Sequence, residues 1–169
     1  MPFWQKNKKQ DKDRINKNQI NIKSPITGEV ISITEVSDPA FSEKMLGDGV
    51  AIHPADGRVV APVNGTVTQM FDTFHAVTLT SNEGVEILIH VGINTVQLKG
   101  EFFIPHVKTG DSIKIGDLLL EFDLNAIRKE YETVTPVVIC NCDEFKNFKV
   151  ITGKDKSEGD EIIVMEKGK

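Results

Sequence analysis

The sequence predicts an all-β protein, and three features carry this prediction. Valine, isoleucine and threonine gather in short runs, which is typical of β-strands. Turn-forming residues, among them many of the 13 glycines and 7 prolines, interrupt these runs at intervals of roughly eight to twelve residues. Few stretches remain that could form helices. With 169 residues, of which 39% are hydrophobic, the chain is long enough to form one domain with its own core.

Taken in order, strand-turn-strand segments follow one another from residue 20 onward. They cover residues 20–36, 49–71, 74–93, 103–123, 135–141 and 161–165. Between the first two segments, residues 38–47 predict a short helix. Asp38 is a suitable N-cap, Pro39 fits the first helical position, and Gly47 is a suitable stop.

A second helical turn is predicted within residues 123–132. Either Asp123 or Asn125 can act as its cap. Ile127 and Tyr131 are four residues apart, so they lie one above the other on such a helix. We expect this helical turn to be a connector between strands.

The first 19 residues differ in charge from the rest of the chain. They contain six basic and two acidic residues, a net charge of +4, so the remaining residues carry −9 within the total of −5. We expect residues 1–19 to form a disordered basic arm and residues 20–169 to form a single domain. Basic residues are dispersed over the acidic domain, which argues against nucleic-acid binding because that function needs a basic face.

The sequence also predicts where the protein works. No run reaches the roughly 18 apolar residues that span a bilayer. The first residues, MPFWQKNKKQ, lack the apolar core of a secretory signal. We therefore expect a cytoplasmic protein that does not span the membrane.

A faint internal repeat connects two parts of the chain. Residues 24–33 and 61–70 share the pattern small-Pro-x-x-Gly-x-Val. Two copies are too few for a repeat array. They suggest two similar β-turn units that face each other.

The chemistry of the chain is expected at two histidines that one hairpin brings together. Two β-rich runs flank the turn cluster at residues 81–84. If the hairpin closes symmetrically about Asn82 and Glu83, His75 lies directly opposite His90, with Cβ atoms roughly 4.5–5.5 Å apart. A loop of three or five residues would shift the register by one and place the rings on different faces.

An adjacent histidine pair suits two chemistries. It can bind a divalent metal such as zinc, provided that a third ligand is available. Alternatively, one neutral imidazole accepts a phosphoryl group as a nucleophile, and the other donates a hydrogen bond to the phosphoryl oxygens. The sequence has no motif for binding nucleotide phosphates, so the phosphoryl group would have to come from another protein.

Seven motifs along the chain stand in the order in which a known family has close equivalents. They are SPITGEV, EKMLGDGVAIHP, APVNGTV, FHAV, GVEILIHVGINTVQLKG, GDLLLEFD and TPVVICN. The chain resembles the glucose-class IIA component (EIIA type-1) of the bacterial phosphoenolpyruvate-dependent sugar phosphotransferase system, over nearly its whole length from about residue 20. The resemblance implies a small antiparallel β-sandwich of the duplicated hybrid motif (barrel-sandwich) type that carries phosphoryl groups on a histidine.

The resemblance also implies roles for individual residues and partners. His90 matches the residue that is phosphorylated on Nε2, and His75 matches the neighbour that assists transfer. Thr73 corresponds to a hydroxyl that orients His75, and Gly92 to a carbonyl near Nδ1 of His90. The implied donor is the phosphocarrier protein HPr, and the acceptor is the IIB domain of a sugar permease. The protein would be a monomer that requires no cofactor, with weak zinc binding at His75 and His90 when a partner completes the site.

Further residues are expected to contact partners. Asp38 and Asp143 match acidic residues that partner arginines can reach, whereas Asn94 and Gln97 stand where family members have acidic residues. An exposed ring of apolar side chains around the histidines is expected to dock partners. Its members are Phe41, Met45, Leu46, Phe71 and Leu88.

Two alternative functions remain open on the sequence. A zinc hydrolase that cuts cell-wall peptides on a related scaffold would need a third protein ligand and usually a His-x-His pair, which this chain lacks. A non-catalytic regulator that binds transporters or kinases is compatible with the same surface.

Overall fold

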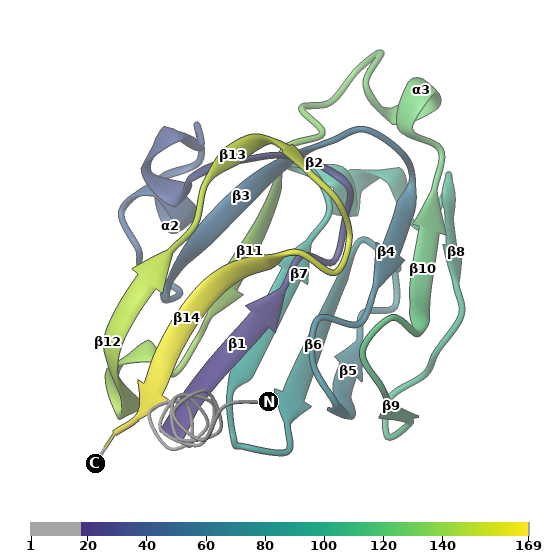
Figure 1. The fold of residues 1–169 in the computed structure, drawn as a ribbon. Coiled ribbons are helices and arrows are strands. Elements are labelled where there is room, and N and C mark those ends of the chain that lie inside the picture. The colour runs from purple at the N-terminus through teal and green to yellow at the C-terminus, as the bar shows by residue number, and fades with distance from the viewer. Residues whose placement is uncertain (1–17, 169) are drawn as a thin grey trace, which may run out of the picture.

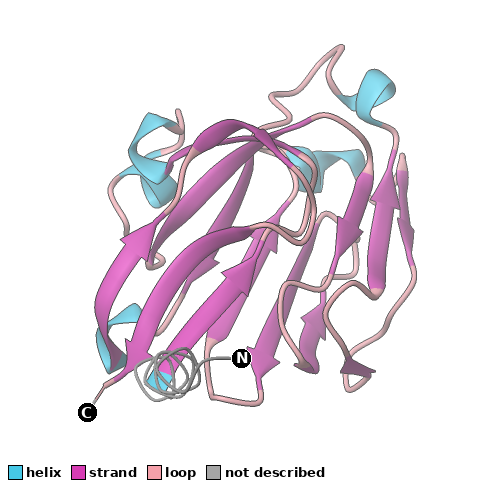
Figure 2. Ribbon diagram, in the orientation of Figure 1, coloured by secondary structure: helices cyan, strands magenta, loops and turns pink. Residues whose placement is uncertain are grey.

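The computed structural model describes residues 18–168, which form antiparallel β-sheets packed as a sandwich (Figures 1 and 2). The strands are β1 (Gln19–Lys23), β2 (Gly28–Ser32), β3 (Asp48–Pro54), β4 (Arg58–Val60), β5 (Gly65–Met70), β6 (Ala76–Ser81), β7 (Glu86–His90), β8 (Phe103–Pro105), β9 (Ser112–Ile113), β10 (Leu118–Phe122), β11 (Thr135–Ile139), β12 (Phe145–Val150), β13 (Gly153–Lys156) and β14 (Glu161–Lys167). The helices are α2 (Pro39–Ser42) and α3 (Leu124–Ile127), with 3-10 turns η2 (Ile33–Glu35), η3 (Thr95–Leu98) and η4 (Cys142–Glu144). The predicted all-β sandwich is confirmed.

The strands form three sheets. The large sheet has the order β13-β2-β3-β11-β7-β6-β5-β9, and the two smaller sheets have the orders β1-β14-β12 and β4-β10-β8. Ile22 of β1, Ile163 of β14 and Leu120 of β10 share one hydrophobic core with Ile87 and Ile89 of β7. The smaller sheets therefore cover one face of the large sheet.

The internal repeat corresponds to two equivalent strand starts. Gly28 begins β2 and Gly65 begins β5, and each strand pairs with the next strand along the chain. A Cβ atom on Gly28 would overlap the carbonyl oxygen of His53, and one on Gly65 would overlap that of Thr80. The same close backbone approach therefore explains the glycine in both copies.

The central strands are buried on both faces of the large sheet. Successive residues of a strand point to opposite faces, so Ile89 joins the main core, whereas Leu88 joins a second cluster on the other face. This second cluster consists of Ile33, Val36, Phe41, Ala51, Ala76, Leu88, Ile93, Val134 and Val138. Burial on both faces explains the continuous apolar run of β7, and His90 is placed on the face of the second cluster.

The first predicted helix is present but shorter than expected. Asp38 caps α2, because its carboxylate accepts a hydrogen bond of 2.9 Å from the backbone of Ala40. The helix ends at Ser42, and Lys44 already adopts a left-handed conformation with φ of 58°. The predicted stop at Gly47 is therefore wrong, since the chain leaves the helix before it reaches this glycine.

The second predicted helical turn corresponds to α3. Asp123 is its cap, and its carboxylate accepts a hydrogen bond of 3.0 Å from the backbone of Ala126. Ile127 is buried, and Tyr131 packs against the main core. The choice between Asp123 and Asn125 is thus made by the structure.

The predicted arm of residues 1–19 lies outside the described residues, except for its last two residues. Gln19 already belongs to β1, where it pairs with Glu166 of β14. The first strand thus begins one residue before the predicted boundary. In the described part of the chain, no helix is long and apolar enough to cross a membrane.

Candidate active site

The β6–β7 hairpin closes one residue away from the predicted register. Ala76 pairs with His90, and the backbone carbonyl of His75 accepts a hydrogen bond of 2.8 Å from Val91. The predicted pairing of His75 with His90 is therefore wrong. The cause is a three-residue loop at residues 82–84, whose last residue is a glycine with φ of 90°.

The two histidine rings nevertheless lie next to each other. Their centroids are 4.9 Å apart, and the ring planes are inclined at 85°. Strand β6 begins only at Ala76, and Phe74 has φ of 60°, so the alternation of a regular strand does not extend to His75. Because Ala76 presents only a methyl group beside His90, there is room for the His75 ring. The expected proximity is thus confirmed, although the expected register is not.

A backbone carbonyl fixes the His90 ring. Nδ1 of His90 lies 2.7 Å from the carbonyl oxygen of Gly92. Because a carbonyl can only accept, Nδ1 carries the hydrogen of the neutral ring and Nε2 carries the lone pair. The ring of Phe41 packs against His90 with a centroid distance of 5.2 Å. His90 therefore offers Nε2 as a nucleophile of fixed orientation.

The position of this carbonyl requires a glycine. Gly92 has φ of 75°. A Cβ atom there would lie 2.6 Å from Cγ2 of Thr95 and 2.8 Å from the carbonyl oxygen of Glu132. A larger residue would be strained by its backbone conformation and would also collide with its neighbours. The carbonyl that the resemblance assigned to Gly92 is present at the expected atom of His90.

His75 is oriented by a side-chain hydroxyl. Its Nδ1 lies 2.6 Å from Oγ1 of Thr73, and the ring of Phe71 meets it edge-on with a centroid distance of 5.6 Å. A hydroxyl can donate or accept. When Thr73 donates, Nε2 of His75 carries the hydrogen and can donate it to a group bound on His90.

The environment keeps both imidazoles neutral. Burial and, to a lesser degree, the neighbouring His90 lower the pKa of His75 to about 4. Burial also lowers the pKa of His90, against the opposing effects of the Gly92 hydrogen bond and the negative charge of Asp38. At neutral pH the pair therefore presents an uncharged nucleophile beside an uncharged hydrogen-bonding partner.

The predicted apolar ring is exposed only in part. Phe41 is 4% exposed and Leu88 is 9% exposed, and both belong to the second cluster. The prediction that these two residues are exposed for docking is wrong, because their side chains fill the space between α2 and the large sheet. Phe71 is half-buried and packs against the same cluster. Met45 and Leu46 remain as exposed apolar residues, at 71% and 44%.

Val96 is an exposed apolar residue close in sequence to His90 that the motifs did not identify. Val96 lies on η3, two residues after Asn94, and is 48% exposed. No local signal separates it from Thr95 and Leu98 in the same turn, which are buried and packed against the core, respectively. Met45 and Leu46, which follow α2, and Val96 on η3 are thus exposed apolar residues of the segments that follow Asp38 and His90.

Asp38, Asn94 and Gln97 are polar residues that were predicted to contact partners. Asp38 is close enough for its charge to raise the pKa of His90. Asn94 is exposed and has φ of 63°, a left-handed conformation that asparagine tolerates better than most residues. Gln97 is also exposed, on η3.

Asp143 lies outside the β6–β7 hairpin, in the turn that follows β11. It belongs to η4, and the preceding Asn141 donates a hydrogen bond of 2.9 Å to the carbonyl of Gly84 in the hairpin loop. His90 is at the opposite end of β7, about 13 Å along the strand. The structure thus brings Asp38 to the histidines and places Asp143 near the other end of the hairpin.

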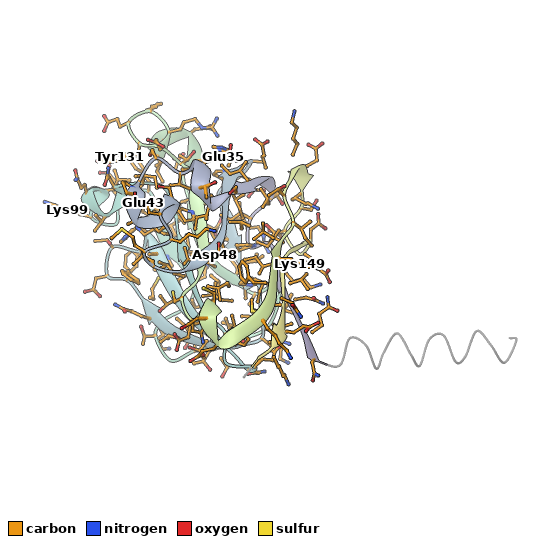
Figure 3. All side chains as sticks on the ribbon, turned by 90° about the vertical axis from the view of Figure 1, so that its left-hand side faces the viewer. Glu35, Glu43, Asp48, Lys99, Tyr131 and Lys149 are labelled. Carbon is orange, nitrogen blue, oxygen red and sulfur yellow. The ribbon has the colours of Figure 1, made fainter. Side chains whose placement is uncertain are left out.

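Several acidic side chains lie on the face of the molecule that carries α2 (Figure 3). Figure 3 shows Glu35, Glu43 and Asp48 on the face that carries α2, with Lys99 and Lys149 toward its two sides. Glu35 and Glu43 are exposed, whereas the carboxylate of Asp48 is paired with Lys44 at 3.4 Å. Such a face is complementary to a basic partner surface.

The histidine pair could supply two ligands to a metal. In both rings Nδ1 is already hydrogen-bonded, which leaves Nε2 available and corresponds to the outer support that metal-binding histidines usually have. Within residues 18–168, no group of three histidine, cysteine or acidic side chains could hold a metal ion. A zinc ion at His75 and His90 would need a ligand from another molecule.

Comparisons with known proteins agree with this geometry. The family described as phosphoenolpyruvate-dependent sugar phosphotransferase system, EIIA 1, matches residues 20–145. The PTS system glucose-specific EIIA component of Oceanobacillus iheyensis is 44% identical over 147 residues, which cover 86% of this chain and 89% of that protein. The PTS system beta-glucoside-specific EIIBCA component of Dickeya chrysanthemi is 48% identical over 133 residues, 78% of this chain and 21% of that protein.

A solved structure has the same fold. The glucose permease IIA of Mycoplasma capricolum superimposes with a TM-score of 0.81 and 33% sequence identity, covering 86% of this chain and 95% of that one. These relatives are phosphotransferase components, so neither the zinc-hydrolase nor the regulator alternative finds support in them. The chain belongs to the EIIA 1 family of the phosphoenolpyruvate-dependent sugar phosphotransferase system and is a phosphocarrier component of sugar uptake.

Proposed function

We propose that His90 accepts a phosphoryl group on Nε2 from phosphohistidine of HPr and passes it to the IIB domain of a sugar permease. The observation that carries this proposal is the 2.7 Å hydrogen bond between Nδ1 of His90 and Gly92. It makes Nε2 the unprotonated nitrogen, and it holds the ring so that this nitrogen has one direction of attack.

The proposed phosphoryl transfer does not require His90 to lose a proton. The N–P bond of the donor breaks as a bond forms between phosphorus and the lone pair on Nε2 of His90. Nδ1 of His90 keeps its hydrogen and continues to donate it to the carbonyl oxygen of Gly92. Positioning and electrostatic stabilisation supply nearly all the catalysis of such a transfer.

His75 stabilises the group during its departure. Its ring is 4.9 Å from that of His90, and Thr73 can hold it in the tautomer with hydrogen on Nε2. From there Nε2–H can donate to a phosphoryl oxygen, where negative charge is concentrated. We therefore assign acceptance to His90 and assistance in transfer to His75.

Partners dock on the surface around this pair. Met45, Leu46 and Val96 provide exposed apolar contact, and Asp38 and Glu43 provide negative charge for basic partner residues. Acceptor and donor would use this surface in turn, because both must reach the same Nε2. Asp143 follows Asn141, whose side chain bonds to the hairpin loop at Gly84, and it would provide further negative charge to a partner that extends toward that loop.

A IIB domain as acceptor is supported by gene fusion in the family. The EIIBCA component of Dickeya chrysanthemi contains a region similar to this chain together with B and C components in one protein. Covalent linkage raises the effective concentration of two domains that exchange a group. We also place the protein in the cytoplasm, where phosphoenolpyruvate is available as the primary donor.

The decisive experiment is phosphorylation in a reconstituted system. The purified protein is incubated with phosphoenolpyruvate, enzyme I and HPr, and its intact mass is measured before and after brief acid treatment. We expect the mass of one phosphoryl group, lost in acid as phosphohistidine requires, with the group mapped to His90. No mass increase, or a group that survives acid, would contradict the proposal.

We further propose that zinc binds only weakly to the isolated protein at His75 and His90. Two imidazoles leave positions of a tetrahedral zinc site without a protein ligand. Titration calorimetry with zinc should show weak binding that is lost in a His75→Gln variant. Tight stoichiometric binding that resists a mild chelator would contradict this proposal.

A further inference from the structure

The turn after His90 contains a buried threonine, Thr95, one turn away from the strand end. Thr95 is fully buried, and its hydroxyl donates to the carbonyl oxygen of Val91. Buried hydroxyls usually satisfy a nearby acceptor. The location of this acceptor, in the peptide group next to the one that contacts His90, connects Thr95 to the active site.

Two consecutive peptide groups meet at Gly92. In the Gly92–Ile93 peptide, the carbonyl accepts from Nδ1 of His90, and the N–H donates to the carbonyl of Glu132 at 3.0 Å. In the Val91–Gly92 peptide, the carbonyl accepts from Thr95. The contacts to His90 and Thr95 thus belong to neighbouring peptide planes joined by one glycine.

A glycine is a weak point in such an arrangement. Gly92 populates left-handed and right-handed backbone conformations with little cost, so the Val91–Gly92 peptide could rotate unless something holds it. The Thr95 hydroxyl holds the carbonyl of this peptide, and its methyl group packs under Gly92, where a Cβ would lie 2.6 Å from Cγ2. The Gly92–Ile93 peptide has its own anchor in the hydrogen bond from Ile93 to Glu132, so rotation at Gly92 would tilt its carbonyl and weaken the contact with Nδ1 of His90.

The carbonyl of Gly92 is what selects the tautomer of His90. Without a carbonyl acceptor at Nδ1, the hydrogen could reside on either ring nitrogen. The tautomer with hydrogen on Nε2 has no lone pair there and cannot attack phosphorus. A residue that fixes the carbonyl therefore controls the fraction of reactive rings.

We propose that Thr95 is a positioning residue. Its hydrogen bond to the Val91 carbonyl keeps the Gly92 carbonyl in place as the acceptor for Nδ1–H of His90, and this contact leaves Nε2 unprotonated. The kinetic part of this inference rests on the proposed phosphoryl acceptance by His90. The tautomer itself can be observed without any partner protein.

The test uses Thr95→Val, which keeps the shape of the side chain and removes the hydroxyl. Nitrogen-15 NMR of the histidine rings distinguishes protonated from bare nitrogens. In the unaltered protein we expect a protonated Nδ1 and a bare Nε2 at His90. In Thr95→Val we expect shifts averaged between the two tautomers. The rate of acceptance from phospho-HPr should fall by about tenfold to a hundredfold, with little change in KM for phospho-HPr.

Two controls separate positioning from general stability. Ser24→Ala removes another fully buried hydroxyl that donates to a backbone carbonyl, that of Ile26 at 2.8 Å, and it should leave the His90 tautomer and the rate unchanged. Thr95→Ser and Thr95→Ala differ by the hydroxyl alone, so serine should retain the tautomer and alanine should lose it. This pair replaces Thr95→Val if that variant does not fold.

The outcomes are unambiguous. An unchanged single tautomer in Thr95→Val, or in Thr95→Ala, overturns the proposal. So does an equal loss of the tautomer in Ser24→Ala. A lost tautomer with an unchanged transfer rate also overturns the positioning role. If the unaltered protein shows the bare Nε2 but is not phosphorylated by HPr, the proposed function fails while the structural effect of Thr95 can still be measured.

Discussion

The turns that follow β7 and precede β6 hold their histidines in different ways. After β7, Nδ1 of His90 meets a backbone carbonyl, that of Gly92. Before β6, Nδ1 of His75 meets a side-chain hydroxyl, that of Thr73. A carbonyl only accepts, whereas a hydroxyl donates or accepts and can rotate.

The type of partner therefore decides which role each ring can have. The carbonyl restricts His90 to one tautomer, which suits a nucleophile that must always present the same nitrogen. The hydroxyl allows His75 to adjust its hydrogen to the charge that develops on a neighbouring phosphoryl group. Two adjacent imidazoles can therefore have different roles because their Nδ1 atoms have different hydrogen-bond partners.

The strongest test of this inequality is removal of the nucleophile. His90→Gln should abolish phosphorylation completely, because the glutamine amide keeps a hydrogen-bonding group near the position of Nε2 but is not a nucleophile. Intact mass after incubation with phosphoenolpyruvate, enzyme I and HPr measures the result. A phosphoryl group on His75 in this variant would mean that the two rings are interchangeable.

The matched change in the other ring should have a smaller effect. His75→Gln should still accept a phosphoryl group from HPr, because His90 and Gly92 are intact. Transfer to IIB should slow by about a hundredfold to a thousandfold, the usual loss when one stabilising donor is removed. Single-turnover transfer from the phosphorylated variant to IIB measures it, and transfer at the normal rate would contradict the assisting role.

The burial of His75 should make the stability of the folded protein depend on pH. Its pKa of about 4 in the folded protein lies below the ordinary histidine value of 6.5, so the unfolded chain binds the extra proton first as the pH falls. The stability that depends on neutral His75 is complete above pH 6.5 and is lost as the pH falls toward 4. Between pH 7 and pH 5 we expect a loss of about 2 kcal/mol in the free energy of unfolding.

Urea denaturation at the two pH values measures this loss. His75→Gln is the control, because glutamine does not titrate and the variant should lose clearly less stability over the same interval. An equal loss in both proteins would show that other groups cause the acid sensitivity.

The smallest expected effect concerns the hydroxyl behind His75. Thr73→Val keeps the size of the side chain but removes the hydrogen bond of 2.6 Å to Nδ1. Transfer to IIB should fall by about tenfold, since an outer partner of this kind contributes less than the group it orients. Thr73→Ser should restore the rate, and failure of serine to do so would assign the effect to packing.

The sequence predicted elements with local causes more reliably than those with distant causes. The caps of α2 and α3 were predicted because Asp38 and Asp123 bond within their own turns. The hairpin register was wrong because the three-residue loop places a glycine in the left-handed conformation. The sequence of the turn is compatible with both a two-residue and a three-residue loop, and strand pairing decides between them.

The candidate site shows the same division. Motifs identified His90, His75, Thr73 and Gly92, whose hydrogen bonds span only two residues each. The exposure of the apolar ring could not be obtained in this way. Phe41 and Leu88 are buried in the second cluster and Met45 is exposed, a difference that depends on contacts with residues far apart in the sequence.

The amino-acid sequence by itself determined the all-β class, the two histidines and the family, because strand periodicity and ordered motifs are properties of neighbouring residues. Only the tertiary structure decided that the rings meet despite a shifted register, that Asp38 is close enough for its charge to act on His90, and that the Thr95 hydroxyl bonds beside the Gly92 turn. These facts depend on how separate strands and loops pack together. Packing is a sum of many weak contacts between residues far apart in the chain, so it becomes definite only in the folded protein.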